Sequence, residues 1–298
     1  MEYAKTGTIC ADEFIIPLLI ISANKACFLS RRADLLKIYM CTMTCKISWS
    51  PMNYQLIGND VLGSEIGIIL PTYREAENIS KLIDDIENLK LNSTILVIDD
   101  SSPDKTAEIV QNKQNKYDNI LLYIRPKKSG LGTALTDGFT FFLATKQAPK
   151  YVVTMDADYS HNPKDIPQLL STMYRTDCGI VIGSRYCRGG NITNWPLTRK
   201  VISRIANFIA KFSLGLKLMD CTSGFRCYST NFLRATIGNL HSHTYEIQIE
   251  TIRQALLRNF KVKETPILFV NRKRGKSKLS WTEIHSFITY TLWAFSRS

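Results

Sequence analysis

Two carboxylates stand one residue apart directly after an apolar run, in the stretch YVVTMDADYSHNP at 151–163. Alternate residues of a strand point to the same side, so Asp156 and Asp158 are predicted to project from a strand end into one small volume. Two like charges repel there unless protons or a cation neutralise them. Carboxylate oxygens suit Mg²⁺ or Mn²⁺, and Mg²⁺ usually takes one or two protein carboxylates together with substrate phosphates. The spacing alone also fits a plain polar turn between a strand and a helix.

Polar side chains also follow two earlier apolar runs, 66–70 and 94–98. A carboxylate at a strand end can accept a hydrogen bond from a base N–H or a ribose hydroxyl. The alternative is structural, with Asp99 capping its own turn and Tyr73 packing against the core. The candidates for a nucleotide at these two strand ends are Pro71, Tyr73, Glu75 and Asp100.

Basic residues supply candidate phosphate ligands. Arg185 follows another strand end in GSRY, and Arg199 and Ser203 lie four residues apart on a predicted helix. That spacing brings a guanidinium and a hydroxyl to one side of the helix, where they suit a phosphate. A solvated helix face is the alternative for the second pair.

Two loops are rich in Lys and Arg. RPKKSGLG at 125–132 lacks the GxxxxGK[ST] spacing of a P-loop, and its glycines fit a tight entry into a helix or a simple turn. NRKRGKSK at 271–278 fits a nucleic-acid patch, a lipid-headgroup patch or a diphosphate clamp. Aromatic residues that would stack on bases are not interleaved with these cations, which disfavours RNA.

The composition is that of a folded, basic chain. Among 298 residues 45% are hydrophobic and the net charge is +12, so a polyanion or an anionic membrane surface is the expected partner. The eight cysteines form no CxxC pair, which indicates free thiols in a reducing compartment rather than a zinc site. The four histidines show no metal or triad spacing, and no GxSxG motif is present.

The first 64 residues lack the regular pattern of apolar runs that begins at residue 65. Phe14 to Ala23 is a ten-residue apolar run interrupted by Pro17, which is too short to span a bilayer. Acidic residues precede it where a signal peptide would be basic. A membrane-surface segment, a buried helix, or a leader read from an upstream start codon remain open; Met40, Met43 and Met52 are alternative starts.

From residue 65 onwards apolar runs alternate with helical patterns. Strands are predicted at 66–70, 94–98, 120–124, 151–155, 179–183 and 265–270, and helices at 76–90, 102–116, 132–146, 163–175, 197–213 and 245–258. Residues 221–229 are predicted to be a turn-rich loop. This alternation predicts an α/β fold with a mostly parallel sheet covered by helices on both faces. Ligands bind beyond the carboxyl ends of such strands, where every polar cluster above is placed.

Taken together and in order, these motifs resemble the dolichol-phosphate mannosyltransferases of the inverting GT-A glycosyltransferase family 2. The resemblance covers about 66–280 and rests on PTYREAEN, VIDDSSPDKT, KKSGLGTA, MDADYSHNPKDIP, GSRYCRGG, RKVISRIANF, TSGFR, YEIQIE and FVNRKRGKSKL. It implies a Rossmann-like GT-A catalytic domain over 65–280, after an N-terminal extension (1–64) and before an amphipathic, membrane-proximal segment (281–298).

The resemblance also implies roles for individual residues. Asp156 and Asp158 would hold Mg²⁺ or Mn²⁺, with Arg185 as the third catalytic residue, and Arg199 and Ser203 would bind the acceptor phosphate. The donor site would comprise Pro71, Tyr73, Glu75, Ile98, Asp100, Asp156, Ala157, Asp158, Arg185, Arg272 and Lys278.

The implied reaction transfers mannose from GDP-mannose to dolichyl or another polyprenyl phosphate with inversion, making a lipid-linked donor for glycosylation. A glucosyltransferase that uses UDP-glucose, or a non-catalytic nucleotide-sugar binder at a membrane, is the alternative. Two departures stand out: Ser160 occupies a position where some members carry Gln, and the chain ends at Ser298 without transmembrane helices. A peripheral enzyme is therefore expected, on the cytoplasmic face of a prokaryotic plasma membrane or of the endoplasmic reticulum. Amphipathic segments, basic residues or an anchoring subunit would hold it there.

Overall fold

The computed structural model describes residues 55–58, 63–271 and 289–291. Nearly all of the predicted N-terminal extension and of the predicted membrane-proximal segment therefore lies outside the described residues. The boundaries proposed for the three parts of the chain remain predictions.

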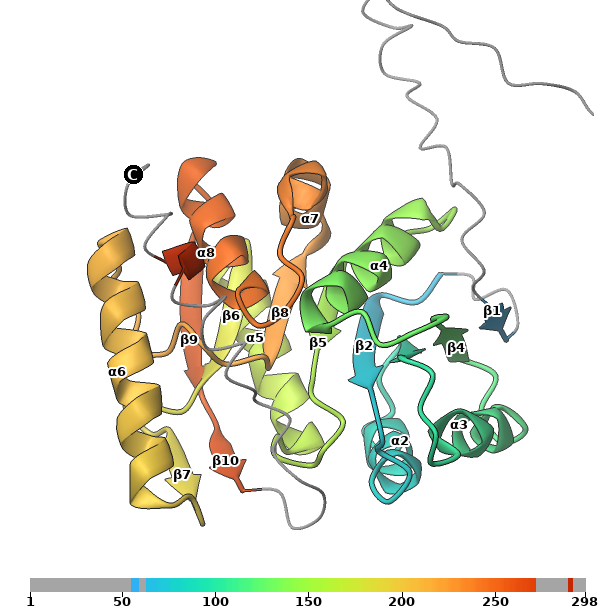
Figure 1. Cartoon of the computed structure of the whole chain (residues 1–298). Helices are drawn as coiled ribbons and strands as arrows, with labels where there is room; N and C mark the ends of the chain where they lie inside the picture. The colour runs from blue at the N-terminus through green and yellow to red at the C-terminus, as the bar shows by residue number, and fades with distance from the viewer. Residues whose placement is uncertain (1–54, 59–62, 272–288, 292–298) are drawn as a thin grey trace, which may run out of the picture. The chain divides into compact units, whose positions relative to one another are not determined.

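The central element is an eight-stranded sheet in the order β1-β4-β3-β2-β5-β8-β6-β9 (Figure 1). The pairings of β2 with β3, β2 with β5, β3 with β4 and β6 with β9 are parallel. β1 runs antiparallel to β4, and β8 runs antiparallel to both of its neighbours. The mostly parallel sheet predicted from the sequence is confirmed. The strands are β1 (Gln55–Ile57), β2 (Ile66–Thr72), β3 (Ser93–Asp99), β4 (Ile120–Ile124), β5 (Tyr151–Thr154), β6 (Ile180–Ser184), β8 (Arg226–Ser229) and β9 (Val262–Pro266).

Helices cover both faces of this sheet, as predicted. They are α2 (Ile79–Glu87), α3 (Thr106–Gln114), α4 (Leu131–Ala144), α5 (Ile166–Thr176), α6 (Leu197–Leu214), α7 (Thr230–Thr236) and α8 (Ile247–Leu257), with 3-10 turns η1 (Pro163–Asp165) and η2 (Ile237–Asn239). A small parallel pair, β7 (Asn191–Thr193) with β10 (Leu268–Val270), lies apart from the main sheet.

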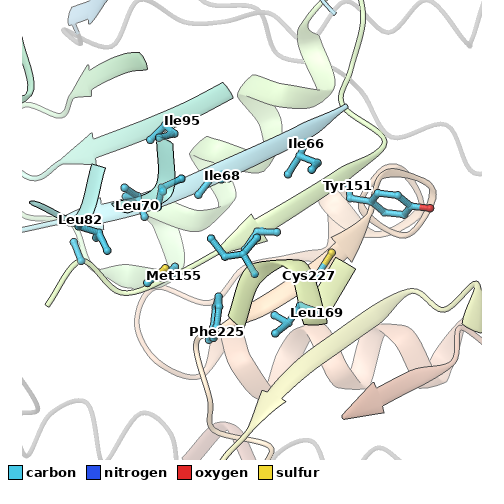
Figure 2. Close-up of a cluster of buried hydrophobic side chains, with 14 of the residues drawn as sticks. Ile66, Ile68, Leu70, Leu82, Ile95, Tyr151, Met155, Leu169, Phe225 and Cys227 are labelled. Atoms are coloured by element: carbon cyan, nitrogen blue, oxygen red, sulfur yellow. The ribbon is translucent and has the colours of Figure 1, made fainter. Parts of the chain in front are cut away.

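Alternation along the strands divides the core into two layers. Ile66, Ile68 and Leu70 of β2 pack with α2, α3 and α5 on one face (Figure 2). Ile69 of β2 packs with α4, α7 and α8 on the other. Because both faces are covered, the central strands are apolar throughout, which is why they read as continuous runs in the sequence.

Three local predictions are wrong. Residues 226–229, predicted as part of a loop, form the buried antiparallel strand β8 in the middle of the sheet. Its four residues are too few to show a strand pattern, and it includes Arg226, whose guanidinium is held by buried backbone carbonyls. The helix predicted from Ser102 begins only at Thr106, because Ser102 is bonded to Asp99 instead. The strand predicted at 265–270 is divided between β9 and β10.

No helix in the part of the chain that the structure describes combines the length and the apolar character needed to cross a bilayer.

Candidate active site

A cavity of about 110 Å³ lies where β2, β3 and β5 end at their carboxyl edges. These three strands are neighbours in the sheet, so the loops that follow them converge on one place. The cavity is lined by eight of the residues proposed for the donor site, namely Pro71, Tyr73, Glu75, Ile98, Asp100, Asp156, Ala157 and Asp158. Residues from separate motifs, up to 87 positions apart between 71 and 158, therefore share one wall.

Asp156 and Asp158 both reach the cavity, but not because they share a strand register. β5 ends at Thr154, and the two aspartates lie in the turn that follows it. Asp158 is buried and accepts a hydrogen bond from the Ser160 amide, 3.0 Å from its Oδ1. The side chain of Asp156 is 37% exposed. The turn holds one carboxylate rigidly and leaves the other more open to a ligand.

The surroundings of the two aspartates fit a divalent cation. His161 is buried, its Nδ1 lies 3.9 Å from Asp156 Oδ2, and its ring stacks on Phe225. Burial lowers the pKa of His161 to about 4, so the imidazole is neutral at pH 7 and adds no competing positive charge. Within the described ranges Ser160 Oγ and His161 Nδ1 are buried polar atoms without hydrogen-bond partners.

No group of three or more His, Cys, Asp or Glu side chains suited to a metal occurs among the described residues. Two carboxylates with substrate phosphates are nonetheless the usual protein share of a Mg²⁺ site, so Asp156 and Asp158 fit this role.

At the other end of the cavity the side chains suit a base and a sugar. Glu75 is buried and its Oε2 accepts a hydrogen bond from Asn78 Nδ2 at 2.8 Å. The Tyr73 ring lies under Lys128 Nζ, 4.9 Å from the ring centre. Asp99, by contrast, accepts from Thr72 Oγ1 and from the Ser102 amide, both at 2.8 Å. The structural interpretation of Asp99 as a turn cap is therefore correct, whereas Tyr73 lines the cavity.

Asp100 is held by an arginine to which the sequence motifs gave no role. The Arg125 guanidinium, directly after β4, contacts the buried Asp100 carboxylate at 2.5 Å. Burial raises the pKa of Asp100 in spite of this guanidinium. The only signal in the sequence was the position of Arg125 directly after a predicted strand, at the start of the basic loop RPKKSGLG.

That loop and the one before α8 form a further wall. Gly130 has φ +98°, a conformation that favours glycine, and it lines the cavity with Lys128 and Leu131. A Cβ on Gly132 would stand 2.2 Å from the carbonyl oxygen of Ser242, so the two loops meet at a residue without a side chain. Tyr245 reaches the cavity from this second loop. Lys128, Gly130 and Leu131 belong to the motif KKSGLG, and Tyr245 belongs to YEIQIE. The spacing of these residues in the sequence alone assigned them no role.

Arg185 lies in a second cavity of about 210 Å³ rather than among the residues lining the first. Its guanidinium donates to both carboxylate oxygens of Asp220, at 2.7 and 2.8 Å, and to Thr222 Oγ1. Lys200 and Arg204 of α6 line the same cavity. Asp220 is completely buried, and because it neutralises Arg185 the net positive charge of this cavity rests on the two α6 cations.

Arg199 and Ser203 lie one helical turn apart on α6, as predicted. Arg199 stacks over the Trp195 ring at 4.3 Å and donates to Asn271 Oδ1 at 3.2 Å. Ser203 Oγ accepts a hydrogen bond from the Tyr186 hydroxyl at 2.8 Å. Tyr186 also lines the second cavity, so Ser203 is linked to that cavity through the Tyr186 hydroxyl. Arg272 and Lys278 lie outside the described residues.

The arrangement combines carboxylates for a cation at one end of a cavity with acceptors for hydroxyl and N–H groups at the other. A cluster of cations on α6 lies beside it. This is the chemistry needed to bind a nucleoside diphosphate ester through a metal and to receive a second anionic substrate.

Comparisons with known proteins show the family of this chain. Residues 67–236, more than half of the chain, match the model of glycosyl transferase family 2. The chain is 37% identical to the undecaprenyl-phosphate mannosyltransferase of Micrococcus luteus over 214 residues, which cover 71% of this chain and 86% of that protein. It is 36% identical to the polyprenol monophosphomannose synthase of Mycolicibacterium smegmatis over 221 residues, covering 73% and 82% respectively.

The fold has known counterparts as well. The glucosyl-3-phosphoglycerate synthase of Mycobacterium tuberculosis, solved with Mn²⁺ and UDP, superimposes with a TM-score of 0.58 and 17% identity, over 78% of this chain and 81% of that one. At this identity the likeness concerns the fold alone. The chain is a glycosyltransferase with a GT-A fold, and it belongs to glycosyl transferase family 2.

Proposed function

We propose that this enzyme transfers mannose from GDP-mannose to a polyprenyl phosphate such as dolichyl phosphate, with inversion and with the help of Mg²⁺ or Mn²⁺. The observation that carries the proposal is the meeting of eight predicted donor-site residues in one cavity. The two relatives named above are at least 36% identical to this chain. Their names, undecaprenyl-phosphate mannosyltransferase and polyprenol monophosphomannose synthase, support the sugar and the lipid acceptor.

The donor would lie along the cavity with its nucleoside at the end formed by Tyr73, Glu75 and Asp100. The carboxylates would accept from ribose hydroxyls or base N–H groups, and Tyr73 would offer a stacking face. The diphosphate would then reach Asp156 and Asp158. A divalent cation held by these two residues would supply positive charge for the diphosphate.

The transfer needs positioning more than proton chemistry. A phosphate monoester oxygen of the lipid is already anionic near neutral pH, so no general base is required. It attacks the anomeric carbon in line, forming a C–O–P bond, while the bond from that carbon to the diphosphate breaks and nucleoside diphosphate leaves with the electron pair. Attack opposite the leaving group inverts the anomeric configuration. Arg185, Arg272 and Lys278, which the family resemblance assigns to the donor site, would stabilise the leaving nucleoside diphosphate.

We assign the lipid phosphate to the side of the site formed by Arg199 and Ser203 on α6. The same helix gives a reason to expect membrane contact. Leu197, Ile205 and Phe208 are exposed on one side of α6, and Phe208 is 69% exposed. Three cations of α6 lie along one edge of this exposed apolar side, because their spacing of four and seven residues repeats the helical turn. They are Lys200, Arg204 and Lys211. An apolar face bordered by cations suits the boundary between acyl chains and anionic headgroups.

We place the enzyme at the cytoplasmic face of its membrane. The support is chemical: Cys178, Cys187, Cys221 and Cys227, the cysteines that the structure describes, are all free thiols. Free thiols suit a reducing compartment. Membrane binding by the purified chain alone would show that no anchoring subunit is needed.

A radiolabelled-donor panel tests the proposed reaction. The purified chain would be incubated with polyprenyl phosphate and GDP-mannose, UDP-glucose or UDP-N-acetylglucosamine, with Mg²⁺, Mn²⁺ or EDTA. We expect label to become lipid-extractable from GDP-mannose only, and only with metal.

The other possible results of this panel would contradict parts of the proposal. Label from UDP-glucose alone would establish the glucosyltransferase alternative. Nucleotide-sugar binding without transfer from any donor would favour a non-catalytic binder. Unchanged transfer in EDTA would contradict the metal role of Asp156 and Asp158.

A further inference from the structure

Arg125 lies next to the cavity without lining it, and its guanidinium makes several hydrogen bonds. Its side chain is only 4% exposed. Nε and Nη2 both approach Asp100 Oδ1 at 2.5 Å, and Nη2 also donates to the Gly130 carbonyl at 2.9 Å. Nη1 donates to Thr133 Oγ1 at 2.7 Å and to Asp137 Oδ2 at 3.3 Å. The planar guanidinium is thus used on all of its nitrogens.

These contacts join three separate pieces of the cavity wall. Asp100 follows β3, Gly130 ends the loop after β4, and Thr133 belongs to the first turn of α4. The backbone is tied in as well, since the Arg125 amide donates to the Asp99 carbonyl at 2.8 Å. One side chain therefore sets the positions of the strand end that carries Asp100 and of the loop that carries Lys128.

The hydrogen bonds to its two carboxylate oxygens also fix the orientation of the Asp100 side chain. Its Oδ1 is bound by the guanidinium, whereas Oδ2 receives the Ser129 amide at the longer distance of 3.3 Å. A carboxylate has about four acceptor positions, so Oδ2 keeps capacity for a ligand hydroxyl or N–H. Asp100 lines the cavity, so a ligand there is within reach of that carboxylate.

The positive charge of Arg125 also acts on the two carboxylates that it contacts. Burial raises the pKa of both Asp100 and Asp137, and the Arg125 charge opposes this for both. Without a paired cation a carboxylate buried to this degree is costly to ionise. A lysine would keep the charge but could not reach Asp100, Gly130 and Thr133 at once, because it lacks the planar fork.

We infer that Arg125 is a positioning residue for nucleotide recognition: it holds the Asp100 carboxylate oriented toward the nucleoside of the donor, and fixes the 126–130 loop beside it. This rests on the proposed function, in that the cavity receives the nucleotide part of the donor. A purely structural ion pair is the competing interpretation.

Nucleoside diphosphate binding by calorimetry, with GDP and UDP as probes, separates the two. We expect Arg125→Lys and Asp100→Asn each to raise the Kd of the bound nucleotide at least tenfold. If Arg125 acts through Asp100, the Kd of the double variant should be no more than about twofold above that of the weaker-binding single variant. The KM for polyprenyl phosphate should stay within about twofold of the wild-type value in Arg125→Lys.

Arg226→Lys is the matched control. Arg226 is fully buried and bound to the carbonyls of Ser223, Gln248 and Cys221, and none of these residues lines the cavity. The substitution should lower the melting temperature without changing the nucleotide Kd. If Arg125→Lys fails to fold, Thr133→Val and Asp137→Asn loosen the same guanidinium from its other side, and each should raise the Kd severalfold.

Three results would overturn the inference. They are an unchanged nucleotide Kd in Arg125→Lys, additive effects of the Arg125 and Asp100 changes, and an equal rise of Kd in Arg226→Lys. These differ from failure of the proposed function, in which the wild-type chain itself would bind neither GDP nor UDP.

Discussion

The surroundings of the Asp158 side chain support the role that we propose for it. It is buried, its Oδ1 is fixed by the Ser160 amide, and it faces the same cavity as the more exposed Asp156. A buried carboxylate that lines a polar cavity is costly for stability, which supports the proposal that Asp158 binds a cation.

The first prediction concerns this residue. Asp158→Asn preserves size but removes the negative charge, so kcat/KM should fall by about a hundredfold or more while the fold is kept. The affinity for Mn²⁺ in the presence of nucleoside diphosphate should fall in parallel. Asp118→Asn, at an exposed position, is the control and should behave like the wild type. Near-normal turnover of Asp158→Asn would refute its role as a metal ligand.

Between elements, polar contacts join neighbouring helices on the face of the sheet away from α4. Asp84 of α2 binds Lys113 Nζ at 2.5 Å and the Tyr117 hydroxyl at 2.8 Å, linking α2 to the end of α3. Burial raises the pKa of Asp84, but the hydrogen bonds from Lys113, Tyr117 and Lys116 outweigh it and lower the pKa to about 2.

This contact predicts a pH-dependent contribution to stability. The folded pKa is below the ordinary value of 3.8, so the stabilisation is present above pH 3.8 and is lost as the pH falls towards 2. Asp84→Asn should therefore lower the free energy of unfolding by about 1 kcal/mol at pH 7, a small value because the pair is partly solvated. At pH 2 wild type and variant should unfold at nearly the same denaturant concentration. A difference that persists undiminished at pH 2 would show that the effect is not electrostatic.

The approach of α4 to the loop before α8 is set by a glycine. The Gly132 amide donates to the His243 carbonyl at 2.9 Å, and a Cβ at this residue would overlap the Ser242 carbonyl. Glu250 fixes that loop from the other side by accepting from the His241 and Ser242 amides. The cavity wall that includes Tyr245 therefore depends on close packing between two backbones.

Gly132→Ala should destabilise the protein by about 1–3 kcal/mol, because the two backbones must separate. It should also weaken nucleotide binding, since Gly130 and Tyr245 line the cavity on either side of this contact. Denaturant unfolding and nucleotide titration measure the two effects. Gly238→Ala is the matched control: a Cβ there would have no atom of the described residues within 4 Å, so the stability should change little. Equal behaviour of the two variants would contradict the packing argument.

For the molecule as a whole, the charge of +12 and the exposed apolar side of α6 predict a preference for anionic membranes. Replacing Ile205 and Phe208 together by Lys removes two apolar side chains that would enter the acyl region, each contributing up to about 1.5–3 kcal/mol. Binding to vesicles of mixed neutral and anionic phospholipid should weaken at least tenfold, as measured by sedimentation.

Leu256 and Leu257 on α8 are also exposed and supply the control. Their replacement by Lys should leave vesicle binding nearly unchanged. If the wild-type chain binds vesicles no better than the α6 variant, α6 does not mediate membrane contact. Transfer to a short-chain, water-soluble polyprenyl phosphate should persist in the α6 variant, because Ile205 and Phe208 do not line the cavity proposed for the donor.

The order of the elements and most of the wall of the cavity at the ends of β2, β3 and β5 can be predicted from the amino-acid sequence. The apolar runs of β2, β3, β4 and β5 are buried on both faces, so they are recognisable without knowledge of their partners. Because parallel strands end at a common edge, polar residues after β2, β3 and β5 must converge if those strands are neighbours. The eight predicted donor-site residues that line the cavity follow from this rule together with the family motifs.

Contacts between residues far apart in the chain became visible only in the folded molecule. β8 is a strand because it lies between β5 and β6, not because of its four-residue pattern. Arg125 and Asp220 are important through partners 25 and 35 positions away, Asp100 and Arg185, and no local spacing reveals such pairs. Arg185 is placed in the second cavity for the same reason. The role of a buried charged side chain depends on the group that neutralises its charge. The fold determines which group that is, because the two partners are far apart in the sequence.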